Sequence, residues 1–160
     1  MRRFREDLAF YHTLKKPNDE LPSLIELFKC ACSPRMLPVL LIRIQHASRS
    51  KWYRPIAMIA QALQLIIFGL ECSHQARISG GLFLPHPTGV VLGAESIGSK
   101  VIIYQGVTLG ATSLDISNSQ GRPVIGSNVI IGAGATVLGD VNIPSGSRIK
   151  AMSLVLNSLQ

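Results

Sequence analysis

The second half of the chain carries an aliphatic residue at every sixth position, with one step of seven. The series is Ile78, Leu84, Val90, Ile97, Ile103 and Leu109, and after a break Ile125, Ile131, Val137, Ile143, Ile149 and Val155. Small residues such as Gly98 and Gly110 follow several of them, which suits a tight corner. A fixed short period is typical of a solenoid, in which stacked units share one core. The repeat predicts a left-handed parallel β-helix, in which three hexapeptides complete a triangular coil and the twelve positions make about four coils.

The amino-acid composition fits such a prism. Of the 160 residues, 47% are hydrophobic but only 6% are aromatic, and 16% are charged. A disordered chain is poor in aliphatic residues and rich in charge, so the composition excludes disorder. The narrow interior of a triangular coil has little room for rings, which accounts for the scarcity of aromatic residues.

A polar segment interrupts the repeat between residues 111 and 124. Its sequence, ATSLDISNSQGRPV, lies between two runs of the repeat and contains Asp, Asn, Ser, Gly and Pro. We expect it to leave the prism and return as a protruding loop. Loops on a regular scaffold often carry function.

Before the repeat, apolar residues recur at intervals of three and four. They are Leu24, Leu27 and Phe28 in one segment and Leu37, Leu40, Leu41 and Ile44 in another. This period predicts helices over about residues 21–32 and 36–48, and Pro55 opens a third helix that ends near Gly69. The chain therefore divides into an N-terminal α-helical region, residues 1–68, and a β-helix domain, residues 69–160, with the loop at 111–124.

The most apolar window, residues 55–70, reads PIAMIAQALQLIIFGL. Its 16 residues would span about 24 Å as a helix, which is short of the roughly 30 Å hydrocarbon core of a membrane. A buried or interfacial helix is therefore favoured over a membrane span. No apolar stretch follows the start Met1-Arg2-Arg3, so we expect no secretory signal and a cytoplasmic protein.

Positive charge is concentrated in the helical region. Residues 1–68 hold 11 Lys and Arg against 5 acids, and so carry +6 of the total +7. The basic residues are scattered among Leu and Ile without the aromatic platforms or recognition helix of nucleic-acid binders. We favour a solvated helical face and keep anionic lipid or an anionic substrate as the alternative. Cys30, Cys32 and Cys72 lack the paired spacing of a zinc site, which favours free thiols in a reducing compartment.

Two segments of the repeat resemble a known family. Residues 68–112, FGLECSHQARISGGLFLPHPTGVVLGAESIGSKVIIYQGVTLGAT, and residues 123–156, PVIGSNVIIGAGATVLGDVNIPSGSRIKAMSLVL, are similar to hexapeptide-repeat acyltransferases of the serine acetyltransferase type, including related surface-polysaccharide O-acetyltransferases. The helical region resembles the family loosely, most clearly at residues 43–46, RIQH. The resemblance implies direct transfer of an acetyl group from acetyl-CoA to an acceptor hydroxyl. The acceptor would be L-serine, in cysteine biosynthesis, or a sugar, in polysaccharide biosynthesis.

The resemblance also implies the catalytic residues. A histidine in the motif filled here by Pro85-His86-Pro87 is the general base of the family, and a carboxylate fifteen residues earlier, at the place of Glu71, assists it. A hydroxyl is a weak nucleophile at neutral pH, and an imidazole with a pKa near 6.5 can take its proton. A carboxylate on the other ring nitrogen fixes the tautomer and stabilises the imidazolium. From the residues alone, a plain corner residue is the favoured interpretation of His86, and Glu71 could be a cap on the first coil.

Acetyl-CoA is the co-substrate that the resemblance implies, bound in the groove between neighbouring prisms of a homotrimer or a dimer of trimers. The matching positions are Gly110 and Ala111 in TLGAT and Ala133 and Gly134 in IGAGA, where missing side chains let the backbone approach the ligand. Lys150 stands where the family usually has glycine, and would reach a CoA phosphate or be solvated. Corner geometry alone would explain the same small residues.

Two positions beside the expected acceptor depart from the serine-specific pattern. Pro85 replaces the aspartate before the catalytic histidine, and Gly121-Arg122 replaces an Arg-His pair, so the grip on an amino acid is expected to be weaker. Arg122 can still hold a carboxylate or a sugar hydroxyl, because a guanidinium is a fork of donors. The chain ends at Gln160, where relatives continue through a Pro-containing tail that helps to cover CoA, so we also expect a weaker hold on the nucleotide.

The histidines and the basic helices bear on two other classes of function. A metal-binding prism needs three imidazoles, whereas only His74 and His86 lie in the β-helix domain and His12 and His46 lie in the helical region, so we expect no metal site. A non-catalytic trimeric scaffold, or an adaptor at the membrane edge that uses the basic helices, is the alternative to an enzyme. Binding of CoA would distinguish the two.

Overall fold

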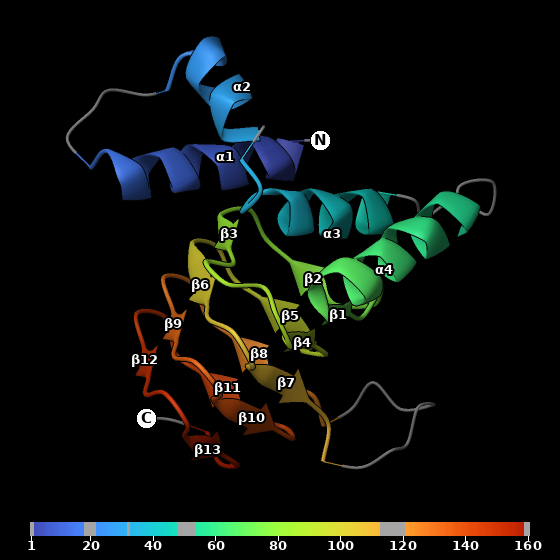
Figure 1. The fold of residues 1–160 in the computed structure, drawn as a ribbon. Helices are drawn as coiled ribbons and strands as arrows, with labels where there is room; N and C mark the ends of the chain where they lie inside the picture. Colours follow the sequence, from blue (N-terminus) through green and yellow to red (C-terminus); the bar gives the residue numbers. More distant parts are fainter. Residues whose placement is uncertain (1, 18–21, 32, 48–53, 113–120, 159–160) are drawn as a thin grey trace.

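The computed structural model describes residues 2–17, 22–31, 33–47, 54–112 and 121–158. Within these ranges the helices are α1 (Arg2–Lys15), α2 (Leu24–Ala31), α3 (Leu37–Ala47) and α4 (Arg54–Phe68). The strands are β1 (Glu71–Cys72), β2 (Arg77–Ile78), β3 (Leu82–Phe83), β4 (Val91–Leu92), β5 (Ser96–Ile97), β6 (Val101–Ile103), β7 (Thr108–Gly110), β8 (Val124–Ile125), β9 (Ile130–Ile131), β10 (Thr136–Leu138), β11 (Asn142–Ile143), β12 (Arg148–Ile149) and β13 (Leu154–Val155). Figure 1 shows the helices at one end of the stacked strands and β13 at the other.

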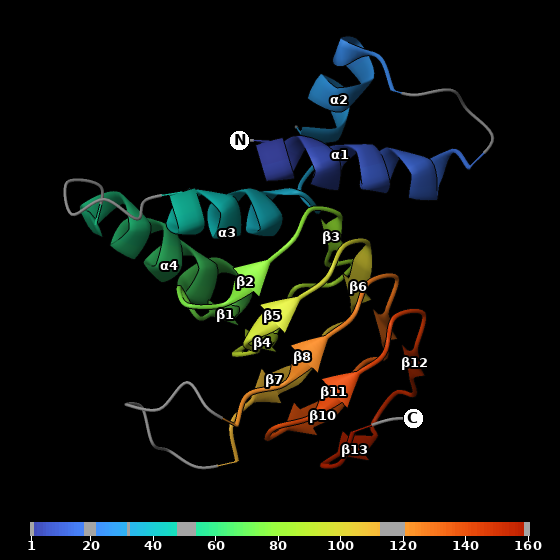
Figure 2. The ribbon, with the colours of Figure 1, turned by 180° about the vertical axis from the view of Figure 1, so that it is seen from behind.

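The strands form three parallel sheets, which are the faces of a triangular prism. The first face contains β1, β4, β7, β10 and β13 in this order, the second β2, β5, β8 and β11, and the third β3, β6, β9 and β12. Each strand therefore pairs with the strand three places later, and the chain passes once round the prism in each coil (Figures 1 and 2). This is the left-handed parallel β-helix that the repeat predicts.

Aliphatic side chains stack in columns inside the prism. On the second face the register superposes Ile78, Ile97, Ile125 and Ile143, none of which is more than 2% exposed. All the repeat positions named above are buried except Val155, in the last coil, which is half-buried. Burial of these stacked columns is the main driving force for the coil, because a single coil has no interior of its own.

One step of the repeat differs from the expected register. Leu92, not Val90, pairs with Leu109 on the first face, although Val90 is buried as well. The corner between β3 and β4 holds two more residues than the corner below it, and the path from Leu92 to Ile97 is one residue shorter than a regular step. Two extra residues at the corner and one fewer in the following path add one residue in total, and the repeat therefore shows one step of seven.

The helical region covers the first coil. α1 packs against β3, α3 packs against α1 and α4, and α4 packs against β1. α2, α3 and α4 begin and end within a few residues of the predicted bounds, whereas α1 was not predicted as a separate element. Leu8 and Tyr11, three residues apart on one face of α1, are buried, and this spacing is the signal that could have identified the helix.

α2 and α4 leave many apolar side chains exposed. On α2, Leu24 is 75% and Phe28 71% exposed, and only Leu27 of the predicted stripe is buried. α4 buries Ala60 and Gln64. Its exposed large apolar residues are Ile56, Met58, Ile59, Leu63, Leu65, Ile66 and Ile67. In the described ranges no helix has both the length and the apolar character needed to cross a membrane.

Candidate active site

The corner between β3 and β4 bulges outward at residues 85–87, Pro-His-Pro. The register before the corner and the hydrogen bond after it, from Gly106 N to Thr88 O at 3.0 Å, show that it holds three residues where the next coil has only Tyr104. Each proline fixes its own φ, and the second also restricts His86 to an extended conformation. The exposed imidazole of His86 therefore projects from a stiff corner.

Glu71 begins β1, the strand at one end of the first face. Its Cα pairs with that of Val91, five residues after His86, and its N–H donates to Val90 O at 2.9 Å. The Glu71 side chain is exposed, and within the described ranges no hydrogen bond joins its carboxylate to the His86 imidazole. The fold thus brings the two predicted catalytic residues to neighbouring coils.

Side chains from α3 and α4 hold β1 in place. Gln45 Nε2 donates to Cys72 O at 2.9 Å, and His46 Nε2 lies 3.1 Å from Ser73 O. Gln64, which is fully buried on α4, donates from Nε2 to Gln45 Oε1 at 3.1 Å. These side chains satisfy carbonyls along the strand edge that no further coil covers, as buried carbonyls require. The RIQH run is thus part of the support for the strand that carries Glu71.

Cys72, between Glu71 and Ser73, is not suited to act as a nucleophile. Its thiol is free and buried, and this burial raises its pKa to about 12. At neutral pH the group is a neutral thiol rather than the reactive thiolate. Cys30 is also a free thiol, and Cys32 lies outside the described residues.

A buried ion pair joins α1, α3 and the segment that leads into β3. The Asp7 carboxylate accepts from Arg43 Nε at 2.8 Å and Nη2 at 2.9 Å, and from the N–H groups of residues 81 and 82 at 2.7 and 2.9 Å. The Arg43 guanidinium also donates to the carbonyl oxygens of residues 78 and 79, at 2.8 and 2.6 Å. This network fixes the chain a few residues before His86, and no sequence motif indicated it.

Arg122 returns from the predicted loop toward β1. Its Nη1 donates to Ser73 Oγ at 3.3 Å, and its Nε is buried without a hydrogen-bond partner among the described residues. The loop predicted at residues 111–124 falls between β7 and β8, and its residues 113–120 lie outside the described ranges. Arg122 therefore contacts Ser73, which lies two residues after Glu71 in the chain, and Pro85 lies on the His86 corner.

Three of the five predicted CoA-binding residues share a corner column with His86. Ala133 and Gly134 lie in the turn between β9 and β10, and Lys150 lies in the equivalent turn one coil later. Met152 N donates to Ala133 O at 2.8 Å, and Gly134 has φ +66°, so the two turns stack. At about 4.8 Å per coil, the Ala133–Gly134 turn lies roughly 10 Å along the prism from the His86 corner.

Gly110 and Ala111 lie on a different corner column. Gly110 ends β7, where it pairs with Leu138, and Ala111 follows at the start of the loop. Two corner columns therefore border the first face. The His86 edge comprises the corners 84–90, 104–107, 132–135 and 150–153. The Arg122 edge comprises the corners 73–76, 93–95 and 139–141, together with residues 110–112 and 121–123.

A metal ion in a protein requires a set of side-chain ligands. Among the residues that the structure describes, no group of three or more His, Cys, Asp or Glu side chains is arranged to hold a metal ion. His74 is exposed on the Arg122 edge, away from the corner of His86. His12 is buried on α1, where its Nε2 lies 3.4 Å from Glu26 Oε1 of α2.

Comparisons with known proteins agree with this architecture. No family model matches the chain. Among curated relatives, a serine acetyltransferase of Helicobacter pylori is 38% identical over 127 residues, which cover 79% of this chain and 73% of the relative. A serine acetyltransferase of Synechococcus elongatus is 35% identical over 129 residues, which cover 80% of this chain and 52% of the relative. The chain thus spans nearly three quarters of one relative and about half of the other.

The solved structures that resemble this chain include serine acetyltransferases as well. A serine acetyltransferase in complex with CoA has a TM-score of 0.75 and 26% identity, and the match covers 98% of this chain and 63% of that chain. A Neisseria gonorrhoeae serine acetyltransferase in complex with serine has a TM-score of 0.76 and 26% identity, covering 99% and 62%. The hexapeptide prism with a histidine on its bulged corner defines the class, the hexapeptide-repeat acyltransferases. Within this class the chain belongs to the serine acetyltransferase family.

Proposed function

We propose that the protein transfers the acetyl group of acetyl-CoA to the hydroxyl of a small acceptor, with His86 as the general base. The observation that carries the proposal is the position of His86. Its exposed imidazole lies on a bulged corner, on the same prism edge as the small turn Ala133–Gly134 and the cation Lys150. A proton acceptor thus sits at one end of a strip of accessible backbone about 10 Å long.

In this mechanism His86 takes the proton from the acceptor hydroxyl as its oxygen attacks the thioester carbonyl carbon. The resulting tetrahedral adduct expels the CoA sulfur when the carbon–sulfur bond breaks, and the His86 imidazolium returns the proton to that sulfur. The products are an O-acetyl ester and free CoA thiol. Glu71, on the adjoining coil, would hold the other ring nitrogen and stabilise the imidazolium.

Acetyl-CoA would lie in a groove between two copies of the chain. His86, Ala133, Gly134 and Lys150 lie on one edge of the first face and Gly110, Ala111 and Arg122 on the other. In a homotrimer, the His86 edge of one copy would face the Arg122 edge of the next, and the two sets would then flank one ligand. The CoA present in the related structure supports this choice of co-substrate.

L-serine is the acceptor that we favour, and a sugar hydroxyl is the alternative. Serine is bound in a related structure, and the curated relatives are named serine acetyltransferases. Arg122, supported by Ser73 Oγ, would hold the acceptor carboxylate beside Pro85. Acetylation of serine would place the enzyme in cysteine biosynthesis in the cytoplasm, where free thiols such as Cys30 and Cys72 persist. A sugar acceptor would place it in polysaccharide biosynthesis.

Thiol release tests the reaction. Purified protein is mixed with acetyl-CoA and either L-serine or a panel of sugars, and free CoA thiol is followed over time. We expect release with serine, and we expect His86→Ala to lower kcat by about 10²- to 10⁴-fold, the usual contribution of a general base. His74→Ala is the matched control, because it removes another exposed imidazole from the same domain.

Three outcomes decide the proposal. Equal rates for His86→Ala and the parent protein would remove His86 from the mechanism. Release with sugars only would retain the mechanism and change the acceptor. No release with any acceptor, together with no heat on calorimetric titration with CoA, would favour the non-catalytic trimeric scaffold.

A further inference from the structure

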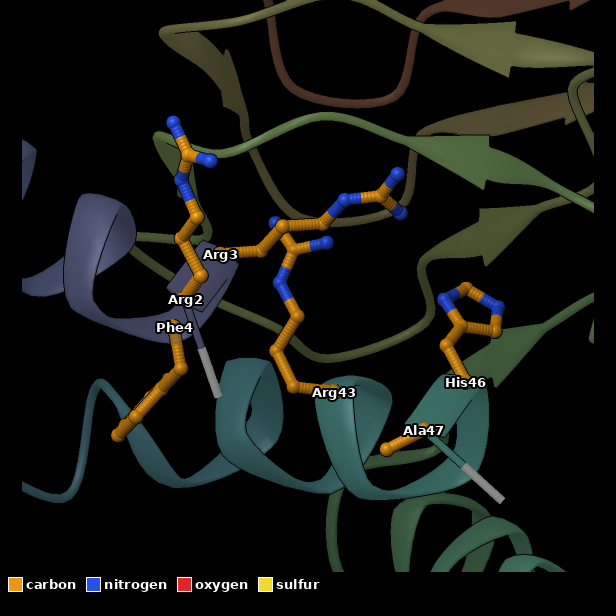
Figure 3. A pocket seen from close by; sticks show the side chains of 6 residues that line it. All are labelled: Arg2, Arg3, Phe4, Arg43, His46 and Ala47. Atoms are coloured by element: carbon orange, nitrogen blue, oxygen red, sulfur yellow. The ribbon is translucent and has the colours of Figure 1, made fainter. Parts of the chain in front are cut away.

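A basic pocket lies between the start of α1 and the second half of α3. Its volume is about 240 Å³, and it is lined by Arg2, Arg3, Phe4, Arg43, His46 and Ala47. Figure 3 shows the three guanidinium groups and the His46 ring on the side of α3 that faces the coils. The lining contains three arginines and no carboxylate.

The arginines of the pocket differ in how far their charge is already compensated. Arg43 is paired with Asp7. Arg2 has only an exposed ion pair, from its Nε to Glu6 Oε1 at 3.4 Å, and such pairs contribute little. Arg3 has no ion-pair partner among the residues described. The pocket therefore keeps an excess of positive charge.

Arg43 gives the pocket a rigid, buried donor. The side chain is 5% exposed and makes four hydrogen bonds, two to Asp7 and one each to Ile78 O and Ser79 O. A guanidinium carries five N–H groups, so one N–H of Nη1 has no protein partner in the described ranges. Arg43 lines the pocket, so this N–H is a donor for an acceptor bound there.

We propose that this pocket binds a phosphate group. Guanidinium groups from two helices surround a small volume, and a phosphate offers oxygens in several directions to such donors, whereas a carboxylate offers one plane. The volume equals that of about eight waters at roughly 30 Å³ each, which accommodates a phosphate with part of its hydration or with a small ester substituent. The phosphate is either free or the headgroup of a lipid such as phosphatidic acid.

The pocket is separate from the predicted CoA site. It lies in the helical region at one end of the prism, whereas Lys150 follows β12, toward the C-terminal end (Figure 1). It nevertheless adjoins the support of the active site, because His46 contacts Ser73 O beside Cys72 and Glu71. An anion bound in the pocket would therefore lie outside the reaction site, next to a side chain that supports the strand of Glu71.

Isothermal titration of the full chain with inorganic phosphate, against sodium chloride of the same ionic strength, tests the site. We expect binding of phosphate, and about tenfold weaker binding for Arg3→Ala and for Arg2→Ala, because each removes a charge-assisted hydrogen bond. Arg5→Ala is the matched control, since Arg5 is an exposed arginine of the same helix outside the pocket. Both test residues are exposed, and a thermal melt of each variant checks that it is folded.

A second arm separates the two sources of phosphate. Phosphatidylcholine vesicles with and without phosphatidic acid are sedimented with the parent protein and with Arg3→Ala. Binding of inorganic phosphate without binding of vesicles identifies a free phosphate as the ligand, and binding of vesicles that Arg3→Ala abolishes identifies a headgroup. No binding in either arm overturns the proposal. An equal loss of binding in Arg5→Ala also overturns it, because phosphate would then be attracted by the overall positive charge and not by a defined site.

Discussion

At the scale of single residues, the strongest constraint in the helical region is the pair Asp7 and Arg43. Asp7 is fully buried, and Arg43 is 6% exposed. Burying two charges is favourable only when their remaining hydrogen-bonding groups are also satisfied. Asp7 meets this condition with Arg43 and two backbone N–H groups, so the loss of its charge would leave the Arg43 guanidinium buried and unpaired.

Removal of the Asp7 charge tests this assignment. We expect Asp7→Asn to lower the free energy of unfolding by about 3 to 5 kcal/mol, the usual cost of breaking a buried pair from one side. Urea denaturation measures the change as a lower midpoint. Glu6→Gln, at the neighbouring exposed position, should cost about 1 kcal/mol or less. Equal costs for the two variants would show that the buried pair contributes no more than a surface charge.

At the scale of the elements, the ends of helices and the corners of coils are set by short-range chemistry. Ser23 and Glu26 form a capping box at the start of α2, in which Ser23 N donates to Glu26 Oε2 at 3.0 Å and Glu26 N donates to Ser23 Oγ at 3.3 Å. The Ser23 hydrogen bonds lower the pKa of Glu26 to about 2, so the carboxylate stays ionised until strongly acidic pH. The corners depend instead on glycines, for two different reasons.

Gly106 and Gly126 illustrate the two reasons, which are a left-handed backbone at one corner and a lack of space for a side chain at the other. Gly106 has φ +66°, and a Cβ there would meet Gly134 Cα at an ordinary 3.6 Å, so Gly106→Ala costs only the strain of a left-handed residue, about 1 kcal/mol. At Gly126 a Cβ would lie 2.5 Å from Ser145 N in the next coil. The coils would have to move apart, so we expect Gly126→Ala to cost about 3 kcal/mol. Thermal unfolding of both variants measures the order, and a larger loss at Gly106 would contradict it.

At the scale of the whole molecule, the exposed apolar face of α4 implies an association. Ile59 is 60%, Leu63 39% and Ile66 79% exposed, and their spacing of four and three places them on one side of the helix. A contiguous apolar stripe of this kind marks an interaction surface. We expect copies of the chain to bury it, which is consistent with the proposed homotrimer.

Light scattering after size exclusion tests the association. We expect a mass near three times the 17.3 kDa of the chain, and a shift toward the monomer for Ile59→Lys combined with Ile66→Lys. Gln61→Lys is the matched control, because it adds a charge to the same helix at an exposed polar position. A monomeric parent protein, or a mass that both changes reduce equally, would argue against α4 as the interface.

Much of the β-helix could be predicted from the sequence because each coil is specified by residues that are close together in the chain. Each hexapeptide carries its own inward aliphatic residue and its own corner, so the period alone indicates three faces and about four coils. The register was mistaken only at Val90, where a corner enlarged by two residues and a turn shortened by one together give the single step of seven. His86 was predicted as the general base from its motif, whereas its alignment with Ala133 and Gly134 on one prism edge required the coil register.

The sequence by itself determined the class of fold, the helical and β-helical regions and the candidate histidine, because all of these follow from periods and motifs within a few residues. Only the tertiary structure decided what joins the two regions. Asp7 meets Arg43 across 36 positions and residues 81–82 across about 75, and no short-range pattern encodes such contacts. The same holds for the basic pocket, which exists only because α1 lies across α3. Local periodicity specifies elements, and burial of charge and apolar surface then selects which of them meet.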